Sequence, residues 1–240
     1  MEYVKNLFRF PTSFLKVYPP IWLGILVLLV AADLGTKKLA TDHLMFHLGH
    51  HQATRYFTSA EDFMQAEATR TGAPQIDILG ENGEYISFEL VFNDRFVFGL
   101  GWSLPPVFGL GLTLLATLFL GLYRWHNPVL GHPVAWLFIF SGAFGNLIDK
   151  MFLKSLATRE WVFSLTNEPG YVWGVVDFVK CIWFGWKDVS DIAFLNILSL
   201  DYWPTFNLAD SLIVVGIGLL LFTIRGAEHS LPQEGQADAE

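Results

Sequence analysis

The sequence predicts a mainly α-helical membrane protein, with four transmembrane helices, a small extramembrane β-sheet and long outer loops. Of its 240 residues, 52% are hydrophobic and 16% are charged, and the mean hydropathy is +0.40. Soluble domains carry about 25% charged residues. Four apolar stretches, at about residues 20–40, 104–123, 133–149 and 206–224, are long enough to cross a bilayer. Residues 1–225 are therefore interpreted as one integral membrane domain.

The first span follows a basic segment with Lys5, Arg9 and Lys16, an arrangement that also resembles a signal peptide. No small-residue cleavage site follows the apolar run, so the sequence favours a retained helix with a cytoplasmic N terminus. Asp33 and Lys37 lie four residues apart in this helix. They share one helix face, where each offsets the cost of burying the other.

Two longer polar segments, residues 41–102 and 151–204, are predicted to lie on the outer side of the membrane. Cations are densest in the short segments at the two ends of the chain and between the second and third spans, which favours cytoplasmic termini. The stretch EYISFELVFNDRFVFGLGW, beginning at Glu84, shows the partial alternation of a short antiparallel sheet. The first half of residues 41–102 is compatible with a helix. Residues 226–240 are predicted to be a disordered cytoplasmic tail.

Composition excludes several functions. The net charge of −8 disfavours a nucleic-acid partner. The single cysteine, Cys181, excludes an intrachain disulfide and does not follow the small residues of a lipidation site, so we interpret it as an inert thiol. His43, His47, His50 and His51 have a spacing that could bind a metal on a helix. A solvated loop explains them equally, and we predict no metal and no cofactor.

The fourth span contains Asp210 about one helical turn inside its start. An ionised group at membrane depth marks a functional site by default. A simpler interpretation is a carboxylate satisfied by free backbone N–H groups at a helix start, with Asn207 as the cap. Asp33, Asn146, Asp149 and Asp210 all fall in the outer halves of their helices. Polar groups from separate spans are thus predicted to face one region.

Five stretches resemble, in order, the motifs of the signal peptidase II family: DLGTK, VFNDRFVFG, GAFGNLIDK, GVVDF and FNLADS. The family consists of intramembrane aspartic proteases that remove the signal peptides of bacterial lipoproteins, cutting before the diacylglyceryl-modified cysteine. The resemblance implies that Asp177 and Asp210 are catalytic. Two carboxylates brought close share a proton, so one acts as base toward water and the other as acid. The sequence does not show which of the two aspartates is the acid and which is the base.

The resemblance also implies substrate-binding or site-supporting roles for seven residues. They are Asp33, Lys37, Asn93, Asn146, Asp149, Lys150 and Asn207. Lys150 stands where the family has arginine, which keeps a cation but loses the planar fork, so substrate contact by Lys150 is in doubt. Arg95 stands where the family has a glycine. The small residues of GAFG are expected to allow close helix packing rather than to bind phosphate.

The resemblance implies an enzyme of the bacterial inner membrane that acts on lipid-modified prolipoproteins among membrane lipids. We expect it to be a monomer. Residues 41–84, 151–170 and 183–204 look like insertions relative to the family, and could gate the site, dock a partner or stiffen its rim. The alternative is a non-enzymatic polytopic protein that uses buried carboxylates for ion transport or helix pairing. Asp177 distinguishes the peptidase from this alternative, because a carrier has little use for an acidic residue in a loop.

Overall fold

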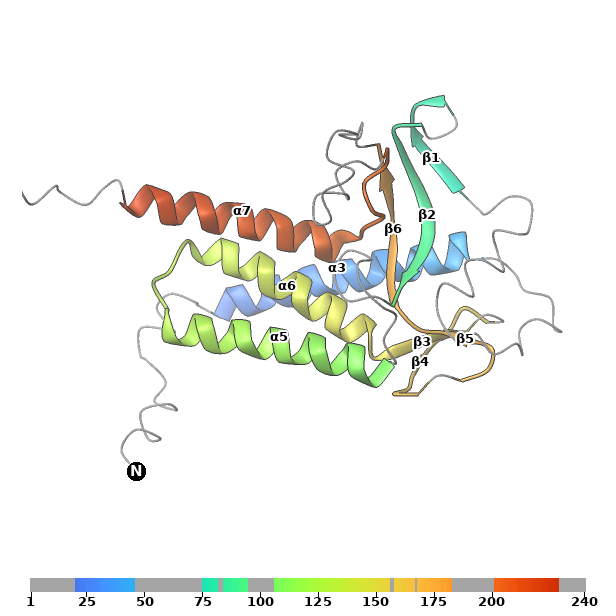
Figure 1. Cartoon of the computed structure of the whole chain (residues 1–240), viewed down its shortest axis with the longest axis horizontal. Coiled ribbons are helices and arrows are strands. Elements are labelled where there is room, and N and C mark those ends of the chain that lie inside the picture. The colour runs from blue at the N-terminus through green and yellow to red at the C-terminus, as the bar shows by residue number, and fades with distance from the viewer. Residues whose placement is uncertain are drawn as a thin grey trace, which may run out of the picture.

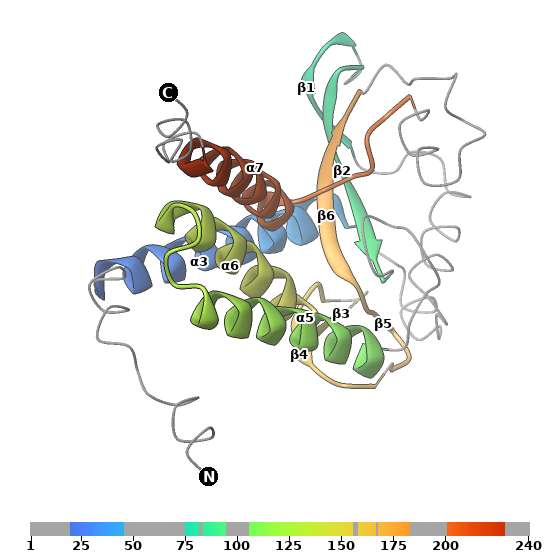
Figure 2. The same ribbon diagram turned by 60° about the vertical axis from the view of Figure 1, so that its left-hand side comes forward.

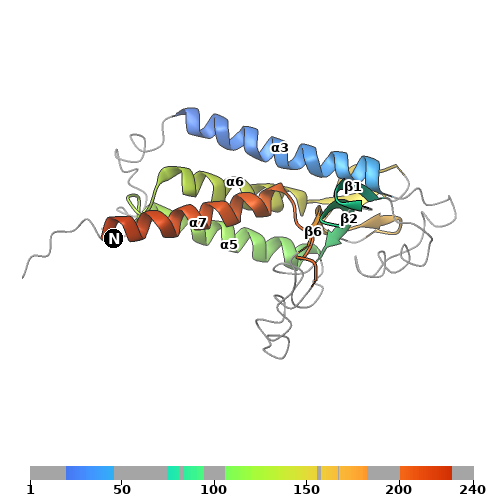
Figure 3. The same ribbon diagram turned by 90° about the horizontal axis from the view of Figure 1, so that it is seen from above.

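The computed structural model describes residues 20–45, 75–81, 84–94, 106–155, 158–166, 168–182 and 201–228. These residues form four helices and two three-stranded antiparallel sheets. The helices run along the long axis of the molecule, and the sheets lie at one end of the bundle (Figure 1). Helix α6 lies within the bundle and packs against α3, α5 and α7 (Figure 3).

The helices are α3 (Pro20–Leu44), α5 (Pro106–His126), α6 (Pro133–Asp149) and α7 (Leu208–Glu228). Three begin at a proline, whose fixed φ and missing N–H suit the first helical position. By length and composition, α3 and α5 are able to cross a membrane, whereas α6 and the apolar part of α7 are shorter. The described part of the chain is therefore mainly helical, with two helices long and apolar enough to cross a membrane.

The predicted spans agree with the helices to within a few residues, with two differences. Helix α3 continues to Leu44, beyond the predicted end near residue 40. Helix α7 continues to Glu228, so the first three residues of the segment predicted to be disordered are helical. The rest of that segment lies outside the described residues.

Glycines on α6 allow the helices to approach closely, as the small residues of GAFG predict. A Cβ added at Gly142 would lie 2.3 Å from the carbonyl oxygen of Ala209 on α7. A Cβ at Gly145 would lie 2.4 Å from Asp33 Oδ2 on α3. Both distances are far below van der Waals contact. The two glycines therefore allow α6 to pack closely against its neighbours, and this prediction is confirmed.

The first sheet has the strand order β1-β2-β6, formed by β1 (Gln75–Leu79), β2 (Ile86–Asn93) and β6 (Val175–Cys181). Strand β2 confirms the sheet predicted in the stretch beginning at Glu84. Figure 2 shows β2 and β6 crossing the end of the helix bundle. The expectation that Asp177 lies in a loop is wrong, because it lies inside β6 and pairs with Val91 of β2.

The two faces of this sheet differ, because one packs in the hydrophobic core and the other carries Asp177. Leu90 and Phe92 on β2 and Val176 and Phe178 on β6 pack with the C-terminal end of α3 in one hydrophobic core. Side chains alternate along a strand, so Asp177 faces the opposite side. The β2–β6 pairing is irregular between Phe88 and Val91, and such bulges re-aim side chains next to functional sites.

The second sheet, which sequence analysis missed, has the order β4-β3-β5 and consists of β3 (Phe152–Ser155), β4 (Trp161–Phe163) and β5 (Tyr171–Val172). It lies mostly in the predicted insertion 151–170. Arg159 donates from Nη2 to the carbonyl oxygen of Met45 at 2.7 Å, and from Nη1 to that of Asp42. The predicted insertion therefore holds the C-terminal end of α3. Most of the other two insertions lies outside the described residues.

Candidate active site

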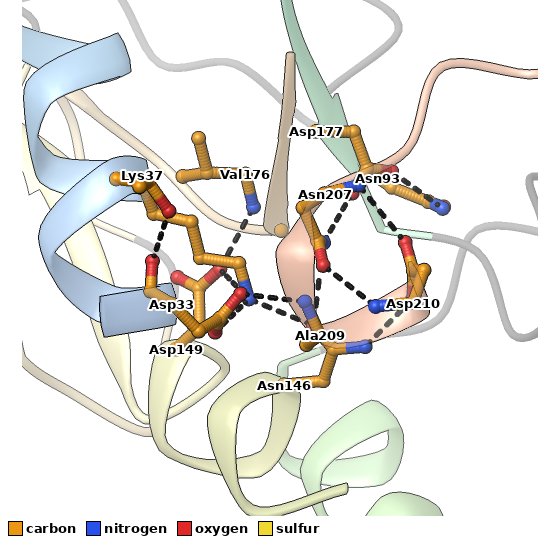
Figure 4. Close-up of polar contacts among 12 residues, drawn as sticks. Asp33, Lys37, Asn93, Asn146, Asp149, Val176, Asp177, Asn207, Ala209 and Asp210 are labelled. Carbon is orange, nitrogen blue, oxygen red and sulfur yellow. Dashed lines mark hydrogen bonds and ion pairs between the residues drawn. The ribbon is translucent and has the colours of Figure 1, made fainter. Parts of the chain in front are cut away.

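Asp177 and Asp210 reach one cavity from different elements. Asp177 comes from the middle of β6, and Asp210 from the first turn of α7 (Figure 4). The cavity has a volume of about 280 Å³, and Asn93, Asn146 and Lys150 also line it. The remaining lining is largely apolar or carries a hydroxyl. It comprises Thr113, Ala116, Thr117, Leu120, Ala143, Val175, Thr205 and Ile213.

Asn207 both caps α7 and links the two carboxylates. Its Oδ1 accepts from the backbone N–H of Asp210 at 3.0 Å, while Asp210 Oδ2 accepts from the backbone N–H of Asn207 at 3.3 Å. This reciprocal pair is a capping box. The Asn207 amide nitrogen donates to Asp177 Oδ1 at 2.7 Å. The capping interpretation of Asn207 is thus correct, and the same side chain also reaches the second aspartate.

Asp177 is nearly inaccessible, with 2% of its surface exposed. Its Oδ2 accepts from the Asn93 amide at 3.1 Å, across the β2–β6 pairing. Burial raises the pKa of Asp177 well above its usual range, and the neighbouring Asp210 carboxylate raises it further. Lys37, Asn93 and Asn207 oppose this shift. The environment therefore favours the protonated form of Asp177.

Lys37 is fully buried and connects α3 to α6 and, through Asn146, to Asp210. Its Nζ lies 2.8 Å from Asp33 Oδ2 and 3.5 Å from Asp149 Oδ2. It also donates to Asn146 Oδ1 at 2.8 Å. Because the oxygen of Asn146 is held by Lys37, its amide nitrogen is free to donate to Asp210 Oδ1, at 2.9 Å.

Asp33 and Asp149 hold backbone segments and do not line the cavity. Asp33 Oδ1 accepts from the N–H of Ala209, in the first turn of α7, at 2.8 Å. Asp149 Oδ2 accepts from the N–H of Val176 at 2.8 Å, one residue before Asp177. Each of these carboxylates therefore fixes the element that carries one member of the pair.

Lys150 is the C-cap of α6 and lies at the cavity, with 6% of its surface exposed. Its Nζ donates to Thr113 Oγ1 on α5 at 2.9 Å. All nine predicted site residues are thus brought together, five of them lining the cavity and four behind it. Arg95 lies outside the described residues, as do three of the four histidines. His43 is exposed in the last turn of α3.

Two groups of residues near the site were not predicted from the sequence. Thr113 and Thr117 line the cavity from one face of α5, but threonine inside an apolar span gives little sequence signal. Lys154 is fully buried, and its Nζ lies 2.5 Å from Asp149 Oδ1. The one signal for Lys154 is a charge next to apolar residues in the short stretch FLKS.

The fold and the site together define a membrane protein with a carboxylate-lined cavity where its helix bundle meets a β-sheet. The sequence profile described as "Signal peptidase (SPase) II" matches residues 25–225. The chain therefore belongs to the signal peptidase II family and is a peptidase.

Individual relatives agree with this membership. The lipoprotein signal peptidase of Leptospira biflexa serovar Patoc is 42% identical over 146 residues, covering 59% of this chain and 70% of the relative. That of Borreliella burgdorferi is 31% identical over 135 residues, covering 55% of this chain and 62% of the relative. A solved bacterial membrane enzyme aligns with 92% of this chain and 96% of its own, at 19% identity and a TM-score of 0.48.

Proposed function

We propose that the protein is an aspartic endopeptidase of the bacterial inner membrane that cuts lipid-modified prolipoproteins before the lipidated cysteine. Asp177 and Asp210 are the catalytic pair in this proposal. The observation that carries it is that both carboxylates line one cavity, joined through the side chain of Asn207. Membership of the signal peptidase II family supplies the substrate class.

The charges around the cavity support a shared proton. Four aspartates lie in or beside the network, namely Asp33, Asp149, Asp177 and Asp210, together with three buried lysines, Lys37, Lys150 and Lys154. Four negative and three positive charges balance when one aspartate is protonated. Burying an unbalanced charge is costly, so the network favours one protonated carboxyl group. A pair with one proton can supply both a base and an acid.

In the proposed reaction, a water molecule attacks the carbonyl carbon of the scissile peptide bond. The ionised carboxylate takes a proton from this water, and the protonated carboxyl group donates its own proton to the carbonyl oxygen. Collapse of the tetrahedral intermediate then breaks the C–N bond. The leaving nitrogen receives the proton held by the pair, and one hydroxyl group of the intermediate returns its proton to the pair, which restores the starting state. Asn93 and Lys150 line the cavity and have N–H groups able to donate to substrate carbonyl oxygens.

The rest of the cavity suits an apolar peptide segment. Ala116, Leu120, Ala143 and Ile213 extend the cavity along α5, α6 and α7, away from the carboxylates. Binding sites of this type combine apolar walls with a few polar groups that fix orientation. A lipid-bearing, apolar segment could therefore enter between the helices while its peptide bond lies beside Asp177 and Asp210.

The proposal includes four crossings, with both termini cytoplasmic and the carboxylates near the outer face. Helices α3 and α6 run toward the sheets and α5 and α7 run away from them, an alternation that four crossings require (Figure 1). Reporter fusions at Gly72 and Arg225 test this topology. We expect the two reporters to lie in opposite compartments. Two reporters in the same compartment would rule out four crossings.

Cleavage of a purified, diacylglyceryl-modified prolipoprotein by the purified protein tests the activity. The expected products are the free signal peptide and a protein that begins with the lipidated cysteine. A matched substrate without the lipid is the control, and we expect it to be cut poorly. A protein that binds ions or lipids but cuts neither substrate would support the non-enzymatic alternative.

A further inference from the structure

Lys154, on strand β3, is buried among the charged residues behind the cavity, although it has no role in the proposed chemistry. Its side chain is fully buried, and its Nζ lies 2.5 Å from Asp149 Oδ1. Lys154 does not line the cavity, so it has no direct route to a bound peptide.

The ammonium group of Lys154 joins two separate segments. It donates to the carbonyl oxygen of Gly174 at 2.7 Å, and to those of Phe152 at 3.1 Å and Asp149 at 3.2 Å. Gly174 immediately precedes β6, and Asp149 ends α6. The φ of Gly174 is +142°, a backbone conformation that favours glycine. Lys154 therefore fixes the end of α6 against the start of the strand that carries Asp177.

Asp149 completes the connection from its other oxygen. Its Oδ1 faces Lys154, while Oδ2 accepts from the N–H of Val176 at 2.8 Å. Val176 is adjacent to Asp177. The carboxylate of Asp149 can hold this orientation only while each oxygen has its partner, because a rotated carboxylate would leave the Val176 N–H buried without an acceptor.

We propose that Lys154 is a positioning residue for Asp177, acting through Asp149 and the Gly174 carbonyl group, and that the insertion thereby stabilises the catalytic geometry. This inference rests on the proposed function. Outer partners of metal-binding side chains typically change affinity or activity by about 10–100-fold, and we expect an effect of this order for the partner of Asp149. Because Lys154 lies outside the cavity, its loss should reduce kcat and leave KM nearly unchanged.

The test measures cleavage of the lipidated prolipoprotein by Lys154→Met, Lys154→Arg and Lys180→Met. We expect Lys154→Met to lower kcat about tenfold or more, with KM changed less than about threefold, and Lys154→Arg to restore part of kcat. Lys180 is the matched control, because it lies on β6 but pairs with Glu89 in a partly exposed ion pair. Its removal should leave both constants close to wild type.

Removing one partner of a buried ion pair can prevent folding, so a second variant combines Lys154→Met with Asp149→Asn. The double variant buries neither charge, so it should fold. If Lys154→Met also folds, the double variant should cleave no faster than Lys154→Met. Wild-type kcat in either folded variant, a loss confined to KM, or failure of both variants to fold would overturn the inference. If wild type cuts and the variants match it, the inference alone fails, whereas a wild-type protein that cuts nothing contradicts the proposed function itself.

Discussion

Asn207 donates its side-chain amide to Asp177 at 2.7 Å from a position one residue before the helix that carries Asp210. The same side chain accepts the backbone N–H of Asp210. Helix capping and the alignment of the two carboxylates are therefore performed by one residue. A substitution that keeps the cap and removes the reach to Asp177 separates these roles.

Asn207→Ser should have near-normal stability and much slower cleavage, because serine is an equally good N-cap but is too short to hold Asp177. Asn207→Ala should lose about 0.5–2 kcal/mol of stability as well. Thermal unfolding in detergent and cleavage kinetics of both variants measure the two effects. Wild-type kinetics in the serine variant would show that the amide contact with Asp177 is dispensable.

Lys150→Arg should preserve or improve cleavage, because the guanidinium group restores a bidentate donor at a position that already holds a cation. Lys150→Ala should weaken substrate binding and raise KM. Thr113→Val tests the restraint on this side chain, since it removes the Lys150 acceptor at 2.9 Å while keeping shape and volume. An alanine variant with wild-type KM would reduce Lys150 to an ordinary cation at a helix end.

Gly145→Ala should be destabilising, because the added methyl group would lie 2.4 Å from Asp33 Oδ2, which pairs with Lys37. Overpacking of this kind costs about 1–3 kcal/mol. Gly121→Ala on α5 is the matched control, since nothing lies within 4 Å of the added atom. Thermal unfolding of the two variants gives the comparison. Equal melting temperatures would mean that α3 and α6 can separate without cost.

Asp177→Asn should stabilise the fold relative to wild type by an amount that grows with pH. The pKa of Asp177 is raised in the folded state, so ionising it costs more there than in the unfolded chain. The stability that its protonated form provides is present below the unfolded pKa of about 3.9 and is lost as pH rises through the folded pKa. Unfolding of both proteins should therefore coincide near pH 4 and diverge toward neutral pH. A gap that narrows as pH rises would contradict this sign.

The helix bundle was predictable from sequence because its signals are local. The apolar run that forms α6 is bounded by Pro133 and Lys150, and the predicted and observed limits coincide. The seven supporting residues were found through motif order, and the structure brings them into one network. Their division into cavity-lining and backbone-holding groups depends on long-range contacts, such as that of Asp149 with the Val176 N–H.

The sequence did not predict that strand β6 continues through Asp177, and the reason is physical. Its first four residues are all buried, so the segment lacks the apolar–polar alternation of a half-exposed strand. Its partner β2 ends more than 80 residues earlier in the chain. The ion pair between Lys154 and Asp149 joins residues close in sequence, but it was not predicted because it depends on how β3 leaves the end of α6.

The catalytic pair is the central claim, and cleavage of a lipidated prolipoprotein by Asp177→Asn, Asp210→Asn and the double variant tests it most directly. Asparagine keeps the shape of the side chain, so each single variant should fold and bind the substrate. We expect each to lose cleavage by about 10³-fold or more, and the double variant to be no slower, because the two groups act as a unit. Near-wild-type turnover by either folded single variant would contradict the assignment.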